Sequence, residues 1–241
     1  MKHKYFFILP VIILIGAVLF GAGWFLMGAD PDNRSGKLEL SSFNNIDLSV
    51  MSGDVTITEG DGYAVEYRLH GREKVKRAEV VNNTLYFDTG FDMQWKPGTG
   101  DWFVMITVPA GTEFESVRLK TTAGDIDFAN YNFQNGTFET TAGDVEISGV
   151  LCDTLNVHTV SDDITLTACT VAQKAELETV SGDIEVEAPF SSIQAKSVGG
   201  ISFNGADQGR RFSIGQGTPE LEASSVSGDI EIVTADSPLN T

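Results

Sequence analysis

The chain has 241 residues, of which 34 are acidic and 16 basic, and its formal net charge is −18. This charge argues against a nucleic-acid partner, because a polyanion repels an anionic surface. Hydrophobic residues make up 41% of the chain, which argues against wholesale disorder and allows a packed core. With only seven Pro and two Cys, the chain is neither collagen-like nor a disulfide scaffold.

The N-terminus contains a candidate membrane anchor. Residues 5–28 are uncharged throughout, and 24 such residues can cross a hydrocarbon core of about 30 Å as a helix. Lys2 and Lys4 precede this run, and Asp30 follows it. The positive-inside bias therefore predicts a cytoplasmic tail at 1–4 and an extracytoplasmic body, which is a single-pass bacterial membrane protein.

A cleaved signal peptide is the alternative interpretation of the same segment. The small residues Gly21 and Gly23 suit a cleavage site before Trp24. The apolar run continues through Met27, however, which favours the uncleaved anchor. No Cys lies near the segment, so lipoprotein anchoring is excluded. Residues 29–40 are predicted to be a linker.

Residues 41–119 are predicted to form a first repeat unit and a strand-rich N-terminal cap. Apolar residues alternate with polar ones in three segments, which we expect to be strands at Tyr63–Leu69, Thr84–Asp88 and Trp102–Val108. Charged or Gly-rich loops are expected to join them.

Two features of these predicted loops are candidate binding surfaces. Five basic residues gather within ten positions: Arg68, Arg72, Lys74, Lys76 and Arg77. We expect a solvated loop there, and the alternative is a patch that meets anionic lipid or a wall polyanion. Phe91, Trp95 and Trp102 flank a Gly-rich stretch at 97–100, where they would either stack on sugars or cover the end of the body.

Residues 120–235 are an internal repeat. A motif recurs along the chain, for example as TTAGDVEI and TVSGDIEV. It consists of Thr or Ser, a small residue, Gly-Asp and a strand in which apolar residues alternate with polar ones. The first apolar residue after each turn is Val55, Ile126, Val145, Ile164, Ile184, Ile201 or Ile230. From Ile126 to Ile201 these residues are 19, 19, 20 and 17 positions apart. One unit is therefore about 20 residues long.

Each unit consists of two strands and a corner. Leu155, Val157 and Thr159 alternate with polar residues before a corner, and Ile164 and Leu166 do so after it. Alternation of this kind buries one face of each strand. The predicted fold is all-β, a β-solenoid in which each two-strand unit buries its apolar face against its neighbours.

The corners carry the most distinctive residues of the chain, which are Gly53, Asp54, Gly124, Asp125, Gly143, Asp144, Asp163, Gly182, Asp183, Gly228 and Asp229. The glycines would allow the bend. Stacking would align the aspartates at a spacing of about 4.8 Å, where two unit charges repel by about 0.9 kcal/mol even in water. The favoured explanation is that each carboxylate accepts hydrogen bonds from N–H groups of its own turn. The alternative is a shared cation such as Ca²⁺, but the known Ca²⁺-binding solenoid repeat GGxGxD is absent.

Two further predictions concern the end of the repeat. Cys152 and Cys169 follow consecutive corners, where a disulfide is chemically allowed outside the membrane, but their different offsets leave the bond an open question. Residues 230–233 are the last predicted strand before a short tail at 236–241, so we expect an edge strand. Asp229, Glu231 and the net charge should keep the soluble body monomeric.

The recurring motifs of the chain resemble those of a known family. The phrases MSGDVTI, TTAGDIDF and VSGDIEV, together with WFVMITVPAGTEFESVRLKTTAGDI at 102–126, are similar to the bacterial "putative adhesin" domain of unknown function. The resemblance covers about residues 40–235. It implies a β-strand-repeat protein outside the membrane, with no catalytic residues to carry over.

The residues themselves give little support to catalysis. His3, His70 and His158 share no motif, and no phosphate-binding or dinucleotide-binding glycine loop is present. We therefore expect no enzyme activity, no cofactor and no metal. The predicted function is a membrane-anchored binding or structural protein of the cell envelope, whose partner is an envelope polymer or a membrane protein. The alternative is a sensory or regulatory module of an envelope-stress system that acts through a membrane partner.

Overall fold

The structure is a computed structural model that describes residues 34–93 and 101–234. The expected membrane anchor at 5–28, the cytoplasmic tail at 1–4, Trp95 and the C-terminal tail at 236–241 lie outside the described residues. Among the residues described, no helix is long and apolar enough to span a membrane. The chain forms 19 strands that belong to one mixed sheet, which confirms the all-β prediction.

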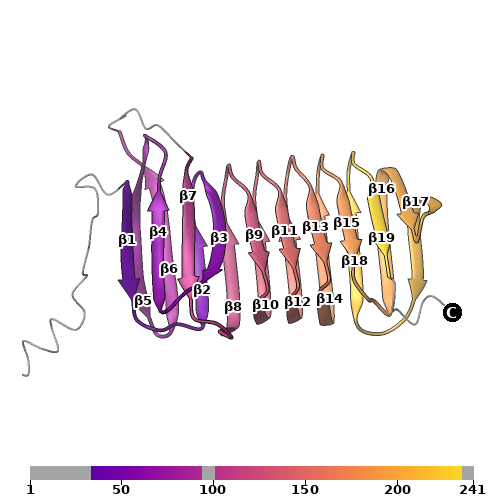
Figure 1. Ribbon diagram of the computed structural model, residues 1–241. Coiled ribbons are helices and arrows are strands. Elements are labelled where there is room, and N and C mark those ends of the chain that lie inside the picture. Colours follow the sequence, from indigo (N-terminus) through magenta and orange to yellow (C-terminus); the bar gives the residue numbers. More distant parts are fainter. Residues whose placement is uncertain (1–33, 94–100, 235–241) are drawn as a thin grey trace, which may run out of the picture.

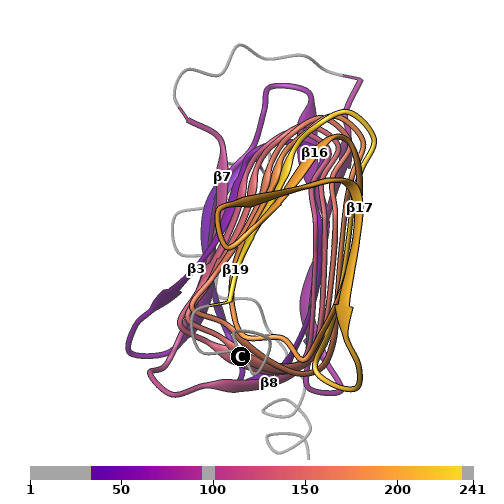
Figure 2. The same cartoon turned by 90° about the vertical axis from the view of Figure 1, so that its right-hand side faces the viewer.

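The sheet folds into a flattened tube with two walls (Figures 1 and 2). Wall A consists of β5 (Glu73–Val81), β6 (Thr84–Phe91), β2 (Asn45–Ser49), β8 (Glu113–Lys120), β10 (Asn132–Glu139), β12 (Leu151–His158), β14 (Thr170–Thr179), β18 (Glu220–Ser225) and the first half of β16 (Ser192–Phe203), in that spatial order. Wall B consists of β1 (Ser35–Leu40), β4 (Tyr63–Arg68), β7 (Phe103–Val108), β3 (Asp54–Glu59), β9 (Ile126–Ala129), β11 (Val145–Ser148), β13 (Ile164–Thr167), β15 (Ile184–Glu187), β19 (Ile230–Val233) and the second half of β16. Strand β17 (Ala206–Gly215) pairs with both halves of β16.

The central units follow the predicted periodicity. Val145 pairs with Ile126 on one side and with Ile164 on the other, so one turn around the tube advances the chain by 19 residues. Leu155, Val157 and Thr159 are buried before the corner, and so are Ile164 and Leu166 after it. The buried residues are therefore odd-numbered before this corner and even-numbered after it, as the alternation in the sequence predicts.

One continuous core runs the length of the tube, from Leu38 to Ile232. Near β8 to β10 it is aromatic, and Phe128 makes ring contacts with Phe114, Phe133 and Phe138 at 5.3 to 6.5 Å between centroids. Under wall A the buried residue at one register position becomes small toward the C-terminal end, with Ala223 and Ala195 in adjacent strands.

The order of the units in space differs from their order in the chain at both ends. Strand β19 lies between β15 and β16, so the prediction that residues 230–233 form an edge was wrong. The edge at that end is β17. At the other end β2 lies between β6 and β8, and β3 lies between β7 and β9.

Two segments predicted as irregular are strands. Residues 35–40, expected within a linker, form β1 and pair with β4. Most of the basic segment, expected as a loop, is β5, which pairs with β6. Its apolar residues Val75, Ala78 and Val80 are too irregularly spaced to show alternation because the register shifts between Val75 and Arg77.

Candidate functional site

The corner aspartates form a column along one edge of the tube. Each carboxylate accepts a hydrogen bond from the backbone N–H of the corresponding aspartate in the next unit, and the N···O distances for Asp54–Asp125, Asp125–Asp144, Asp144–Asp163, Asp163–Asp183 and Asp183–Asp229 are 3.1, 2.9, 3.0, 2.7 and 2.7 Å. The expected role in the turn is therefore corrected, because the acceptor bonds reach the neighbouring turn and not the residue's own. The column joins units to one another.

The column covers only units that have a neighbour on both sides. At its start the Asp54 N–H donates to the carbonyl of Trp102, in a unit whose corner carries no matching aspartate. Next to Asp229 lies β16, where Gly199 and Gly200 occupy the corner. Neither end unit carries an aspartate at the matching position, which is Phe103 at one end and the Gly199–Gly200 corner at the other.

Buried hydroxyls support the corners from inside. Thr179 Oγ1 and Ser225 Oγ accept hydrogen bonds from the N–H groups of Gly182 and Gly228 at 3.1 and 2.9 Å. Ser225 Oγ also donates to the Gly182 carbonyl at 2.9 Å. At these two corners the bonds account for the Thr or Ser that precedes the glycine by three positions.

The corner glycines are required for two different reasons. Gly143 has φ +148°, a left-handed conformation that disfavours side chains. Gly182 does not have a positive φ, but a Cβ placed there would collide with the backbone carbonyl of Asp162 in the unit below. The expectation of positive φ is thus met at Gly143, whereas close approach of two backbones explains Gly182.

The column offers no evident cation site. In each of its first five aspartates one carboxylate oxygen is already bonded to an N–H group. Over residues 34–93 and 101–234, no three His, Cys, Asp or Glu side chains converge so that they could hold a metal ion.

The outer faces of the two walls differ in charge. Strands β9, β11, β13, β15 and β19 of wall B contain no Lys or Arg, and their outward residues include Asp127, Glu146, Glu185, Glu187 and Glu231. On wall A, by contrast, Lys120 pairs with Glu139 at 2.6 Å, and Lys174 pairs with Glu222 at 2.6 Å. The Lys120 hydrogen bond lowers the pKa of Glu139, and the Glu222 hydrogen bond raises that of Lys174. These five strands of wall B therefore present an uncompensated acidic face.

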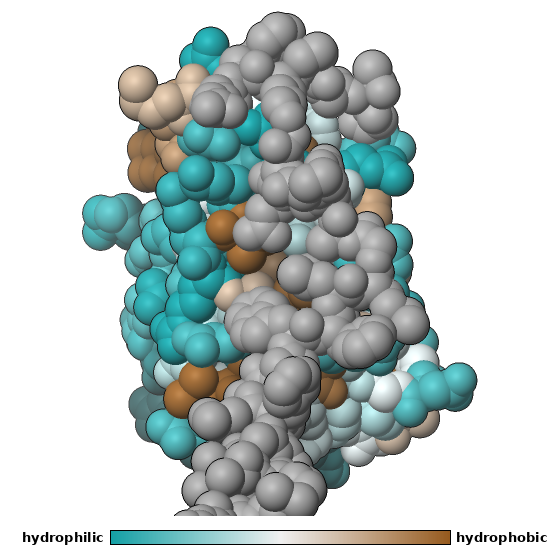
Figure 3. Space-filling model, turned by 90° about the vertical axis from the view of Figure 1, so that its left-hand side faces the viewer, coloured by the Kyte–Doolittle hydropathy of each residue, from teal (hydrophilic) through white to brown (hydrophobic). Residues whose placement is uncertain are grey.

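The predicted basic patch lies at the N-terminal end of the tube, whose surface is shown in Figure 3. Its five residues do not form one free patch. Lys74 Nζ lies 3.7 Å from Asp92, the Arg77 guanidinium lies over the Tyr86 ring at 3.6 Å, and Arg68 lies 5.5 Å from the Phe103 ring centre. Arg72, Lys76 and Arg68 remain exposed.

Among the flanking aromatic residues, Phe91 is exposed, whereas Trp102 is partly buried and meets His70 edge-on at 4.3 Å. His158 is exposed as expected, with its Nδ1 3.7 Å from Glu178. These positions bring no nucleophile and base together.

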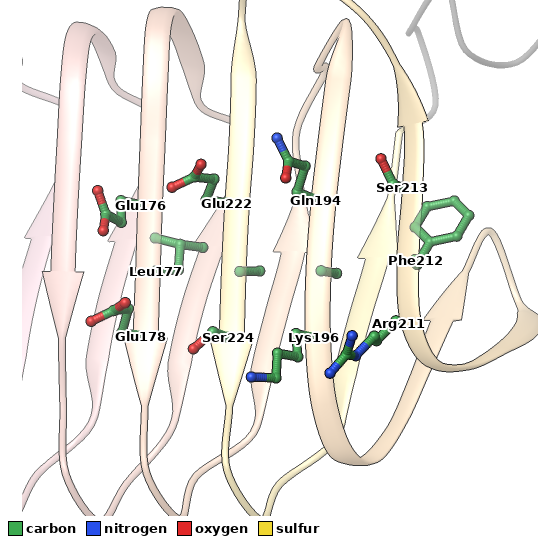
Figure 4. A pocket seen from close by; sticks show the side chains of 12 residues that line it. Glu176, Leu177, Glu178, Gln194, Lys196, Arg211, Phe212, Ser213, Glu222 and Ser224 are labelled. Carbon is green, nitrogen blue, oxygen red and sulfur yellow. The ribbon is translucent and has the colours of Figure 1, made fainter.

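A groove that no sequence motif indicated crosses the outer face of wall A near its C-terminal end (Figure 4). It has a volume of about 420 Å³ and runs over β14, β18, β16 and β17. One rim carries Glu176, Glu222, Gln194 and Ser213, and the other carries Glu178, Ser224, Lys196 and Arg211. The floor is strand backbone at Leu177, Ala223 and Ala195, whose side chains are buried on the opposite face of the wall. The groove exists only because β18 lies between β14 and β16.

The two cysteines are buried free thiols in the structure. The Cys169 thiol lies 3.1 Å from the carbonyl of Thr167 and 3.5 Å from that of Ile147. Burial, together with the neighbouring Cys169 and Asp153, raises the pKa of Cys152 to about 12, and burial also raises that of Cys169. Both are therefore slow nucleophiles.

Comparisons with known proteins support the fold. A model of the family described as "Toastrack DUF4097" matches residues 43–240. A solved structure described as a "putative adhesin" from Bacteroides fragilis is 17% identical, has a TM-score of 0.50, and covers 82% of this chain and 95% of its own. A "putative cell adhesion protein" from Clostridium sporogenes is 12% identical, has a TM-score of 0.40, and covers 83% of this chain and 98% of its own. Comparison with curated proteins finds no match.

Proposed function

Because the chain belongs to the toastrack DUF4097 family, we propose that it is a non-enzymatic, membrane-anchored protein of the bacterial cell envelope. Its body, a β-solenoid in the central units, lies outside the membrane and binds an envelope polymer or a membrane protein. The observation that carries the proposal is the uncharged run at 5–28, preceded by Lys2 and Lys4 and followed closely by the acidic body.

The non-enzymatic part rests on the arrangement of polar groups. Carboxylates of the column bond to backbone N–H groups, and at the groove rim Glu176 and Glu222 bond to Lys174. A carboxylate held in such a structural bond is a poor candidate for proton transfer to a substrate.

The groove on wall A is the binding surface that we propose. Its rims offer Lys196 and Arg211 beside Glu178 and Gln194, a mixture that suits a polar, uncharged or zwitterionic chain. The flat floor across the strands would accept an extended ligand such as a polysaccharide or a peptide strand.

The orientation is tested by labelling single cysteines on intact, wall-stripped cells with a membrane-impermeant maleimide. Val226→Cys, at a position 57% exposed in the body, should be labelled before lysis. Lys2→Cys should be labelled only after lysis. The buried native thiols give a low background. The reverse pattern would contradict the orientation, and release of the body into the medium would show cleavage.

The groove is tested with the full-length protein in lipid nanodiscs, incubated with isolated cell walls. The double variant Lys196→Gln/Arg211→Gln should reduce retention at least about tenfold, as the loss of two charged contacts predicts. Glu146→Gln, on the outer face of wall B, is the control and should retain the parental affinity. Equal retention of both variants would remove the groove from the proposal.

A further inference from the structure

Basic and apolar side chains gather where the described chain begins. We call this place the N-terminal corner and define it by Arg34, Arg68, Arg72, Lys74, Lys76, Phe91 and Met93. Arg34 Nη1 donates to the Gly71 carbonyl at 2.9 Å, and Arg34 Nη2 lies 3.1 Å from Asp92. The Asp92 N–H donates to the Arg72 carbonyl at 2.7 Å. Segments far apart in the sequence are thus held together at one corner.

The corner exposes two large apolar side chains beside its cations. Phe91 is 52% exposed and Met93 is 92% exposed. Lys76 Nζ donates to the Phe91 carbonyl at 3.3 Å, which places an ammonium group next to this apolar pair. Large apolar side chains next to Lys and Arg are typical of surfaces that bind the interface of an anionic membrane.

The chain holds this corner close to the bilayer if residues 5–28 form the anchor. Six peptide steps separate residue 28 from Arg34, and they span at most roughly 20 Å. The Leu69 N–H donates to the Arg34 carbonyl at 2.7 Å, so the chain enters the body at this corner.

The rest of the body should be repelled by the same membrane. Residues 120–234 contain 18 acidic and five basic residues, and the column and the strands β9, β11, β13, β15 and β19 of wall B contain no basic residue. The repeat units extend away from the N-terminal end along the axis of the tube (Figure 1). Charge is thus polarised along this axis.

We propose that the N-terminal corner docks on the anionic lipid headgroups around the anchor, so that the tube stands on this end and its repeat units point away from the membrane. The proposal rests on the anchored orientation proposed above. It adds a second contact with the bilayer, with Phe91 and Met93 in the interface and Arg72 and Lys76 at the headgroups. Each such cation is attracted electrostatically to an anionic surface. The groove then faces sideways, clear of the bilayer.

The test uses the full-length protein reconstituted into vesicles of phosphatidylcholine, with or without 30% phosphatidylglycerol. An environment-sensitive dye is attached at Met93→Cys or at Val226→Cys, two exposed positions of which only the first lies in the corner. With anionic vesicles, spin-labelled headgroups should quench the dye at 93 at least about twofold more than the dye at 226. High salt should weaken this difference, because it screens the cations.

Two variants separate docking from general charge effects. Arg72→Gln/Lys76→Gln should abolish the excess quenching at 93, whereas the matched change Arg210→Gln/Arg211→Gln on β17 should not. Flotation and carbonate extraction report the anchor independently. Protein that stays in the membrane with no excess quenching at 93 would overturn docking alone, and protein that carbonate extracts would overturn the anchor. A response at 93 to soluble wall polyanion but not to anionic vesicles would assign the corner to a polymer.

Discussion

The central units and the two ends of the tube differ in how their strands pair. From β10 to β13 each strand pairs in parallel with the strand one unit before and one unit after, so no edge is open. At both ends a unit lies inside its outer neighbour out of chain order: β2/β3 precede β6/β7 in the chain but lie inside them, and β18/β19 follow β16 but lie inside it. The outermost strands β1, β5 and β17 are antiparallel. The repeated sequence pattern accounts for the strand order of the central units. The strand order at the two ends depends on pairing between strands that are far apart in the chain.

The corner glycines give the sharpest contrast, since the central units should not tolerate side chains there. Gly143→Val introduces a strained φ, and Gly182→Val collides with a backbone carbonyl that cannot move without breaking the stack. We expect each to lower the free energy of unfolding by about 3 kcal/mol or more, measured by urea denaturation. Gly62→Val, in the N-terminal part where no atom lies near the added Cβ, is the control and should change little. Unchanged stability of all three would contradict the close stacking of corners.

The stability of the fold should fall more when a column aspartate loses its hydrogen-bond acceptor than when it loses only its charge. Asp144→Ala removes the acceptor for the Asp163 N–H, and we expect a cost of about 1–2 kcal/mol in thermal or urea unfolding. Asp144→Asn keeps an acceptor and removes repulsion, so its cost should be smaller. Added salt should stabilise the parent more than the Asn variant, because it screens the column. An Asn variant less stable than the Ala variant would show that the charge itself is needed.

The smallest effect is expected on the outer face of wall A. The hydrogen bond from Lys120 lowers the pKa of Glu139, so the ionised form stabilises the fold. This contribution is complete above the ordinary Glu pKa and is lost as the pH falls through the lowered value. Because the pair is partly exposed, Glu139→Gln should cost less than about 1 kcal/mol at pH 7, and this cost should shrink as the pH falls through the lowered pKa. A cost that grows toward low pH would contradict this assignment.

The sequence predicts what is local and periodic. Alternation identified the buried faces of the central strands, and the recurring aspartate located every corner of the column. It could not predict the order of the units, because TVSGDIEV at 179–186 and SVSGDIEI at 225–232 are nearly identical and either could neighbour any other unit. One signal was available: Gly200 stands where the other units have Asp, which marks the unit with no further neighbour. The groove could not be predicted, since its rims come from strands whose adjacency depends on that order.

The basic segment shows a second limit. Lys74, Lys76 and Arg77 suggested a loop because charge dominates the segment. In the structure their side chains bind Asp92, the Phe91 carbonyl and the Tyr86 ring, partners that lie more than eight residues away along the chain. Such contacts help to hold the edge strand β5 in place, and they cannot be recognised from the local sequence.

Cross-linking of paired cysteines tests most directly whether β19 lies between β15 and β16. Glu231 on β19 is paired with Glu185 on β15 and with Ser202 on β16, and paired strand positions fall within disulfide range. The native thiols are buried, which limits side reactions. Under mild oxidation, Glu185→Cys/Glu231→Cys and Glu231→Cys/Ser202→Cys should both form a disulfide, whereas Glu185→Cys/Ser202→Cys should not. A bond in the last pair, with none in the first two, would place β16 directly beside β15 and contradict the account.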